Sequence, residues 1–445
     1  MESRLIFDKN ILVNNILRFK KMTKVILSGK EINIFYAIKA NNCSEVLDVV
    51  FACGVGAEVL SNLELKSIPE CVPVQVNGHQ KSAELLTESC KRANCTINIE
   101  SISELKQIAK IEKQKLIDIA VRIKINENAR IGMSEQEIYE LVNYIKNFSN
   151  INLVGLHFHA GWNLKCNKEY EAIIKRMLSI HEQIVKRGIQ ITSWNMGGSF
   201  TEPSSAPSQL KERLLIIKKY LPKEVTNVCF EPGRYFVGDA GKLYAEVKEK
   251  RGNETIINCS TYGHRLSGAT PSMGYISSIS GTKRDMEISE KDKGMRISGI
   301  WPSENDYIEV KGEGREISEG DTIVFNNMGA YLEGTYSTLW HETIKGYVFV
   351  GELYELVRNL ENEEKYVICK YYQQGEMTIP QNKSERQVVL GALKNIFSTE
   401  RWYTEQEVNA LLAKYNQDYC LLRREMVVNS FLERVMDGEM KYHRK

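Results

Sequence analysis

Short apolar runs recur along the first half of the chain and alternate with segments of helical periodicity. The runs predict eight strands, at 32–38, 57–60, 74–76, 97–99, 119–125, 153–158, 191–194 and 228–230. Apolar positions within residues 8–30, with Asp8 as an N-cap, predict a helix ahead of the first strand. Eight strands that alternate with helices over about 200 residues predict a (β/α)₈ barrel.

The ends of the predicted strands are polar, and in such a barrel the chemistry lies where the strands end. The first strand stops at a single lysine, Lys39, and a lysine costs several kcal/mol to bury unless it has a partner or a carbonyl to condense with. Taken alone, Lys39 also fits a side chain that reaches solvent after its strand. Further polar residues follow the other strands, among them Glu58, Asn77, Glu100, Arg122, His157, His159, Asn195 and Glu231.

The pattern changes after residue 240. Short β-rich segments divided by Gly, Asn and Asp predict a mainly antiparallel β domain, with strands at 255–258, 295–300, 307–310, 321–325 and 347–350. Helix-like segments at 385–397, 405–415 and 419–432 follow a charged run and predict a small helical domain of winged-helix type. We therefore expect a barrel at 8–238, a β domain at 239–360 together with 1–7, and a helical domain at 364–445.

The composition argues against some classes of partner but does not identify the function. The 445 residues are too many for one core, and 59 Lys and Arg against 57 Asp and Glu give no overall field for nucleic acid or an anionic membrane. A small neutral or zwitterionic partner fits better. The N-terminus has no signal-peptide core and no run of apolar residues is long enough to span a bilayer, so we expect a cytoplasmic protein. The ten cysteines form no CxxC pair, so we expect neither disulfides nor a metal site.

Eight motifs occur in a fixed order, FYAIKAN, GAEVLSNLEL, VNGHQKS, INIESISEL, LHFHAG, NMGGSF, EPGRYFV and NNMGAY. Together they resemble the fold-type III pyridoxal-phosphate decarboxylases, the family of diaminopimelate and ornithine decarboxylases. The resemblance covers residues 5–360 and implies decarboxylation of an amino acid with pyridoxal 5'-phosphate as cofactor. It leaves the substrate open between diaminopimelate, a basic amino acid, and a modified or carrier-bound amino acid, so a carrier protein is one partner to consider.

The same resemblance implies roles for the strand-end residues. Lys39 would form a Schiff base with the cofactor aldehyde and exchange it for the substrate amine. Glu231 would keep the pyridine nitrogen protonated, so that the ring accepts the electrons left by carbon dioxide. His159 would stack on the ring, whereas His157 is interpreted as a core or supporting group.

The phosphate and the rest of the cofactor are assigned in the same way. The backbone amides of Gly197, Gly198 and Ser199 would receive the phosphate, because glycines let a chain approach an anion closely. The remaining cofactor contacts implied by the resemblance are Glu58, Arg122, Gly233, Arg234 and Tyr331.

Part of the site would come from a second subunit. In relatives a cysteine followed by Asp or Glu closes the site across a head-to-tail homodimer, and here Ser303 and Glu304 stand in that place. A serine is a weaker proton donor than a thiol by several pKa units, which puts the reprotonation step in question. Arg265, Glu304 and Tyr331 are the expected substrate contacts.

Two other functions remain open on the sequence. Racemases of this fold place an arginine where this chain has Glu231, which argues against a racemase. A non-catalytic, regulatory relative would be expected to have lost Lys39, which is present. The C-terminal stretches RWYTEQEVNALL and DYCLLRREMV resemble a small domain attached to bacterial transcription regulators, and a dimer strut, a carrier-protein dock or a vestigial DNA-binding module would each suit it.

Overall fold

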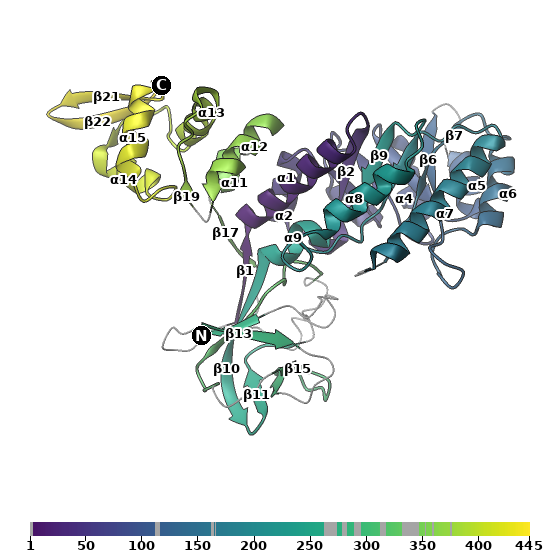
Figure 1. Ribbon diagram of the computed structural model, residues 1–445, viewed down its shortest axis with the longest axis horizontal. Coiled ribbons are helices and arrows are strands. Elements are labelled where there is room, and N and C mark those ends of the chain that lie inside the picture. The colour runs from purple at the N-terminus through teal and green to yellow at the C-terminus, as the bar shows by residue number, and fades with distance from the viewer. Residues whose placement is uncertain are drawn as a thin grey trace. The chain divides into compact units, whose positions relative to one another are not determined.

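Eight parallel strands close into a barrel in the computed structural model, as the apolar runs predicted (Figure 1). The structure describes residues 3–111, 116–161, 164, 166–261, 274–277, 283–288, 295–311, 317–331, 347–351, 353–357, 360–373 and 376–445. The barrel strands are β2 (Glu31–Ala37), β3 (Gly56–Val59), β4 (Val74–Val76), β5 (Cys95–Ile99), β6 (Ile117–Arg122), β7 (Ile151–His157), β8 (Ser193–Asn195) and β9 (Asn227–Phe230). Pairing of β9 with β2 closes the ring.

Helices precede, connect and follow the barrel strands, and serine side chains begin several of these helices. They are α1 (Lys9–Ile26), α2 (Ser44–Ala52), α3 (Asn62–Ser67), α4 (Ala83–Lys91), α5 (Ile102–Ile111), α6 (Glu135–Ile145), α7 (Asn167–Lys186), α8 (Gln209–Tyr220) and α9 (Arg234–Val237). Helices α2 to α8 connect consecutive barrel strands, α1 precedes the first strand and α9 follows the last. Ser61, Ser82 and Ser134 accept backbone N–H groups at the starts of α3, α4 and α6, and the Asp8 carboxylate accepts the N–H of Asn10 as predicted. Each cap satisfies a donor that has no partner within its helix.

An aromatic cluster packs beneath the strand ends that carry the candidate site. Phe19 of α1 is fully buried and lies edge-on to Phe200, Phe230, Tyr235 and Phe236, with ring centroids 5.0 to 5.7 Å apart. Edge-to-face rings at this separation attract one another in addition to burying apolar area. The cluster therefore holds the chain after β8 and after β9 in fixed positions.

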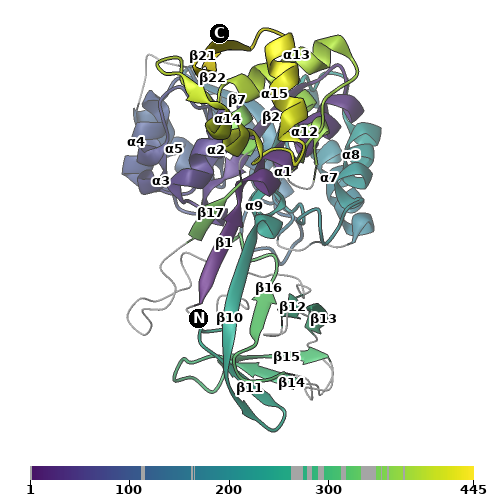
Figure 2. The same cartoon turned by 90° about the vertical axis from the view of Figure 1, so that its left-hand side faces the viewer.

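A mainly antiparallel sheet follows the barrel, again as predicted (Figure 2). Its strands run in the order β11 (Glu254–Ile257), β14 (Met295–Ser298), β15 (Tyr307–Lys311), β13 (Lys283–Ile288), β12 (Gly274–Ser277), β16 (Thr322–Phe325), β10 (Gly241–Arg251), β1 (Arg4–Asp8) and β17 (Tyr347–Val350). β11 and β14 pair in parallel. Leu243, Ala245, Ile323 and Phe325 lie in the core of this sheet, which is what alternation along β10 and β16 requires.

The C-terminal part combines helices with short strands. It contains α11 (Leu353–Val357), α12 (Asn362–Tyr371), β18 (Tyr372–Gln373), β19 (Glu376–Met377), α13 (Lys383–Lys394), β20 (Tyr403–Thr404), α14 (Glu405–Leu412), α15 (Tyr419–Val428), β21 (Leu432–Asp437) and β22 (Glu439–Arg444). The last three strands form an antiparallel sheet in the order β20-β22-β21, and helices followed by a hairpin agree with a winged-helix type. The predicted helix at 419–432 ends early because Ser430 has a φ of 62°, a left-handed conformation that stops a helix.

The chain divides into two compact units. One contains Met1–Phe7 and Arg18–Val348, and the other contains Asp8–Leu17 and Phe349–Lys445. The boundaries expected after residues 238 and 360 stay a prediction. Within the described ranges, no helix has both the length and the apolar character that crossing a bilayer requires.

Candidate active site

A pocket lies at the carboxyl ends of the barrel strands, where chemistry in this architecture is expected. Most of the lining comes from the segments that follow β2, β7, β8 and β9, and Tyr331 joins it from the chain after β16. The lining residues are Ala37, Lys39, His159, Gly161, Gly198, Ser199, Phe200, Thr201, Glu231, Gly233, Arg234 and Tyr331. Residues more than 290 positions apart in the sequence, Lys39 and Tyr331, thus share one cavity.

Lys39 lies in a single 3₁₀ turn, η1 (Ile38–Ala40), directly after β2. Its ammonium forms an ion pair with the buried carboxylate of Glu58, and about a third of its side chain (32%) is exposed to the pocket. Burial opposes the charge, but Glu58, and then Tyr331 and Glu231, outweigh this effect and raise the pKa of Lys39. The lysine is therefore a protonated amine with a proton acceptor in contact.

The lysine turn is tied to the segment that carries Tyr331. The N–H of Tyr331 donates to Ala40 O at 2.6 Å, and Asn41 Nδ2 donates to Gly329 O at 2.9 Å. Tyr331 has a φ of 62°, a strained conformation for a tyrosine that the two hydrogen bonds help to hold. These bonds fix the phenol at the rim of the pocket.

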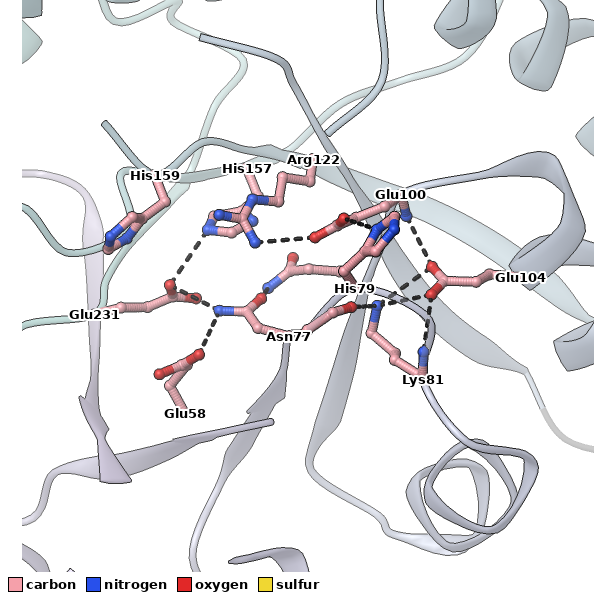
Figure 3. A network of polar contacts seen from close by, with 12 residues as sticks. Glu58, Asn77, His79, Lys81, Glu100, Glu104, Arg122, His157, His159 and Glu231 are labelled. Atoms are coloured by element: carbon pink, nitrogen blue, oxygen red, sulfur yellow. Dashed lines mark hydrogen bonds and ion pairs between the residues drawn. The ribbon is translucent and has the colours of Figure 1, made fainter. Parts of the chain in front are cut away.

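Glu231 is a buried carboxylate held by three side chains, of which Figure 3 shows Asn77 and His157. Asn195 Nδ2 donates to Oε1 at 2.7 Å, Asn77 Nδ2 donates to Oε2 at 2.9 Å, and His157 Nε2 lies 3.2 Å from Oε2. Burial alone would raise the pKa of Glu231, but His157, and then Lys39 and Asn195, bring it down to about 2. Glu231 thus presents a fixed negative charge to the pocket.

Asn77 joins the two carboxylates of the site (Figure 3). Its Nδ2 donates to Glu58 Oε1 at 2.9 Å as well as to Glu231, and its Oδ1 accepts from Asn98 Nδ2 at 2.7 Å. Asn98 in turn donates to Gln75 Oε1 at 3.1 Å, so the amide of Asn77 cannot reverse without losing its acceptor contact. The sequence marked Asn77 and Asn195 only as polar strand ends and assigned them no role.

His159 faces the pocket as a neutral imidazole. Its Nδ1 accepts the N–H of Gly198 at 3.2 Å, so Nδ1 carries no proton. Burial, and then the charges of Lys39 and Arg122, lower the pKa of His159 to about 3. A neutral ring can lie against a flat ligand without bringing a second positive charge into the site.

The loop after β8 approaches its neighbours so closely that two of its residues must be glycine. A Cβ on Gly197, whose φ is 59°, would lie 2.2 Å from Phe158 O, and one on Gly198 would lie 2.9 Å from Glu231 O. Ser199, the next residue, also has a positive φ of 71°. Such a succession of turned residues makes backbone N–H groups converge in a concave surface.

The loop's hydrogen bonds show which of its groups remain available. The N–H of Gly197 donates to Asn195 Oδ1 at 2.9 Å, and the following N–H is bound by the imidazole. Within the described residues, the N–H groups of Ser199 and Phe200 have no hydrogen-bond partner, and neither has the buried Oγ of Ser199. The glycines therefore shape the loop, and the next two residues offer its free donors.

Arg234 begins α9 at the edge of the pocket. Its guanidinium lies over the ring of Tyr331 at 5.3 Å and 4.0 Å from Glu202 Oε2. Gly233, just before it, is confined because a Cβ there would lie 2.9 Å from the Cβ of Ala40. Gly233 and Arg234 line the same pocket as the loop after β8.

Glu58 and Arg122, two other residues predicted for the site, are not among those that line the pocket. Glu58 reaches the pocket through Lys39, whereas Arg122 donates to Glu100 Oε1 at 2.9 Å. Arg265 lies outside the described residues. In the part of the chain that the structure describes, no three His, Cys, Asp or Glu side chains are placed to hold a metal ion.

Ser303 and Glu304 lie in the loop between β14 and β15, and neither lines the pocket. Ser303 is half-buried and Glu304 is exposed. The loop is nevertheless well ordered by Asp306, whose buried carboxylate accepts the N–H groups of Thr261 at 2.7 Å and Trp301 at 2.8 Å. A rigid surface loop of this kind can present its side chains to a second molecule.

Acid should destabilise the cofactor-free protein through the pocket. His159 has a pKa of about 3 when folded against 6.5 for an ordinary histidine, so the unfolded chain binds the proton more tightly and stability falls as the pH drops through this window. The lowered pKa of Glu231 adds a further loss below about pH 4.5, where the unfolded carboxylate protonates first. Urea-unfolding midpoints at about pH 7, 6 and 5 measure the effect. His159→Gln should reduce the change of the urea midpoint with pH, and an unchanged dependence on pH would contradict the prediction.

Comparison with known proteins agrees with this geometry. Residues 13–238 match the family described as pyridoxal-dependent decarboxylase, pyridoxal binding domain, and residues 377–444 match the uncharacterized protein conserved in bacteria (DUF2087). Diaminopimelate decarboxylase of Aquifex aeolicus is 23% identical over 67% of this chain and 76% of its own length. The enzyme of that name from Haemophilus influenzae is 26% identical over 67% of this chain and 77% of its own length.

Solved structures share the fold. The diaminopimelate decarboxylase of Helicobacter pylori complexed with L-lysine superimposes with a TM-score of 0.63 at 21% identity, covering 76% of this chain and 88% of that one. The Paramecium bursaria Chlorella virus arginine decarboxylase bound to agmatine gives 0.64 at 19% identity, covering 79% and 96%. The family match spans more than half of the chain and confirms the resemblance read from its motifs. The chain therefore belongs to the pyridoxal-dependent decarboxylases, which act on amino acids with pyridoxal 5'-phosphate as their cofactor.

Proposed function

We propose that this enzyme removes the α-carboxylate of an amino acid that is diaminopimelate-like, basic, or bound to a carrier. One observation carries the proposal. The amine of Lys39 and the ionised carboxylate of Glu231 line the same pocket from the ends of β2 and β9, which are paired strands. An amine that can bond to an aldehyde and a carboxylate that can hold a proton on a ring nitrogen are the two groups this chemistry requires.

The residues of the pocket suit pyridoxal 5'-phosphate. Lys39 Nζ would bind the aldehyde carbon, and Glu231 would accept a hydrogen bond from the protonated ring nitrogen. The free N–H groups of Ser199 and Phe200, the buried Ser199 Oγ and the Arg234 guanidinium would bind the phosphate. An anion provides the acceptors that the Ser199 and Phe200 donors lack among the described residues.

When bound, the cofactor supplies a ring that accepts the electron pair left on carbon as carbon dioxide departs. The chain's own groups manage protons and orientation. Glu58 contacts Lys39 Nζ and is placed to take the proton that the ammonium must lose before it can act as a nucleophile. Asn77 and Asn195 hold Glu231 so that its charge stays directed into the pocket, and neutral His159 covers the ring face.

A second copy of the chain would complete the site. Ser303 and Glu304 lie on a rigid, accessible loop outside the pocket of their own chain, as a shared site in a head-to-tail dimer would require. The Ser303 hydroxyl would then return a proton to the carbon that lost its carboxylate. Glu304 would bind a distal amine of the substrate, with Tyr331 at the rim and Arg265 opposite a distal carboxylate.

Incubation with candidate substrates tests the proposal. The purified protein with pyridoxal phosphate is given diaminopimelate, lysine, ornithine, arginine and carrier-linked forms, and carbon dioxide and the product amine are followed by mass spectrometry. At least one substrate should release carbon dioxide and leave the matching amine. Inversion of a stereocentre without loss of mass would indicate a racemase, and no change in any substrate would contradict catalysis on this class.

Mixing two inactive variants tests the shared site. Lys39→Ala and Glu304→Ala chains, each inactive alone, should regain up to about a quarter of the native activity after subunit exchange. Random pairing makes about half of the dimers mixed, and each mixed dimer has one intact site of its two. Native mass spectrometry verifies exchange. Verified exchange with no recovered activity would mean that each site is built from one chain.

A further inference from the structure

Arg213 lies on α8, behind the loop that we assign to the phosphate. Its side chain is fully buried, and its guanidinium donates hydrogen bonds to Ser199 O and to Leu164 O. It also lies over the ring of Tyr170 at 4.7 Å and at 5.8 Å from the ring of Phe200. Nothing in the sequence distinguishes this arginine from the other charged residues of an ordinary amphipathic helix.

The charge of Arg213 has no ion-pair partner in the described residues. No carboxylate there lies within ion-pair distance, and the hydrogen bonds of its guanidinium go only to backbone carbonyls. A buried cation of this kind is costly, so burial lowers the pKa of Arg213, and Tyr170 and Glu212 offset this effect only in part. Burial also raises the pKa of the Tyr170 phenol, so Tyr170 stays neutral and cannot balance the charge. An anion in front of the loop would relieve this cost.

The hydrogen bond to Ser199 O also sets the direction of the loop's donors. In a trans peptide the carbonyl and the next N–H point in opposite directions, so a Ser199 carbonyl turned back to Arg213 turns the N–H of Phe200 the other way. Phe200 lines the pocket, and its N–H has no partner among the described residues. Arg213 also contributes to holding Ser199 at a φ of 71°, a conformation that serine rarely adopts.

We propose that Arg213 is the positioning residue of the phosphate site: it fixes the Ser199–Phe200 turn with free donors toward the pocket and places a positive charge behind them. The side chain does not touch the ligand. It acts through the loop and through its field, which a low-dielectric surrounding screens only weakly. The inference rests on the proposed placement of the phosphate at this loop.

Two ligands that differ only in the phosphate separate this role from a structural one. The full-length cofactor-free protein is titrated with pyridoxal phosphate and with pyridoxal, and binding is followed by the visible absorbance of the bound ligand. Arg213→Met should weaken the binding of pyridoxal phosphate about tenfold to a hundredfold, the range seen when a residue that supports a metal ligand is lost. The affinity for pyridoxal should change less than about threefold. Arg213→Lys keeps a positive charge but loses the forked guanidinium donor, so its affinity for pyridoxal phosphate should lie between those of the wild type and Arg213→Met.

Arg92→Met is the matched control. Arg92 lies between α4 and β5, is also buried, and donates to the backbone carbonyls of Ile68 and Val72 in the connection between β3 and β4. Its loss should lower thermal stability and leave the ratio of the two affinities unchanged.

Equal weakening of both ligands by Arg213→Met, or no weakening of either, would reduce Arg213 to a structural residue. If Arg213→Met does not fold, Arg213→Lys decides it instead, because a selective loss of at least about threefold for pyridoxal phosphate is still required. A wild-type protein that binds neither ligand would refute the proposed function itself, which is a different result from binding that ignores Arg213.

Discussion

Lys39→Ala should lose activity by roughly a thousandfold or more, together with the visible absorbance of bound cofactor. The reason is chemical, because no other lysine lines the pocket in the described residues and no other amine there can bond to the aldehyde. Folding should survive, because the Glu58 carboxylate left behind still accepts a hydrogen bond from Asn77 at 2.9 Å. Far-ultraviolet circular dichroism and the urea midpoint check the fold, and absorbance titration checks the cofactor.

Lys39→Arg is the informative control for this prediction. An arginine keeps the positive charge beside Glu58 but is not nucleophilic, so the ion pair persists while the covalent bond cannot form. We expect it to be as inactive as the alanine variant and more stable. Visible absorbance like that of the wild type in either variant would remove Lys39 from its assigned role.

Glu231→Gln should lower the rate of decarboxylation by a hundredfold to ten-thousandfold, by order of magnitude, while cofactor binding changes far less. The substitution removes the charge that holds a proton on the ring nitrogen. Asn195 and Asn77 each donate a hydrogen bond to the Glu231 carboxylate. The introduced glutamine has only one acceptor oxygen, so its NH₂ group would face one of these two donors. Asn77 cannot turn to help, because its oxygen is engaged by Asn98. The turnover number under saturating cofactor measures the loss of rate, and the cofactor dissociation constant measures the change in binding.

A second carboxylate–histidine pair provides the control for Glu231. Glu224 Oε1 lies 3.1 Å from His181 Nε2, and neither residue lines the pocket. Glu224→Gln therefore repeats the same chemical change at another such pair in the barrel and should leave the rate within about twofold, as surface substitutions usually do. Equal losses in the two variants would mean that Glu231 acts only through the stability of the barrel.

The barrel was predictable because each of its strands is a short apolar run bounded by turn residues. The barrel buries the inner face of each strand and the surrounding helices cover much of the outer face, so β2 and β7 are mostly buried and rich in apolar residues. The polar residues after the strands were predictable for the same reason, since they stand where the apolar pattern stops. Lys39, His159 and Glu231 could therefore be expected near one another from the sequence alone.

The contacts among these residues could not be predicted. Asn77 meets Glu231 across 154 positions of sequence, and which amide meets which carboxylate depends on strand register and on closure of the ring. Arg213 was missed because one inward-facing arginine in an amphipathic helix leaves no trace in the pattern of apolar positions. The hairpin β21 and β22 was missed because apolar residues continue past Val428 and hide the left-handed turn at Ser430.

Reduction of the loaded enzyme with borohydride, followed by peptide mass mapping, tests the central claim most directly. Reduction makes the bond between cofactor and lysine permanent, so the modified residue can be identified regardless of the substrate. We predict the added mass on the peptide that contains Lys39, and its absence when pyridoxal phosphate is omitted. Stoichiometric modification of a different lysine, or no modification of an enzyme shown to bind the cofactor, would contradict a site built around Lys39 and Glu231.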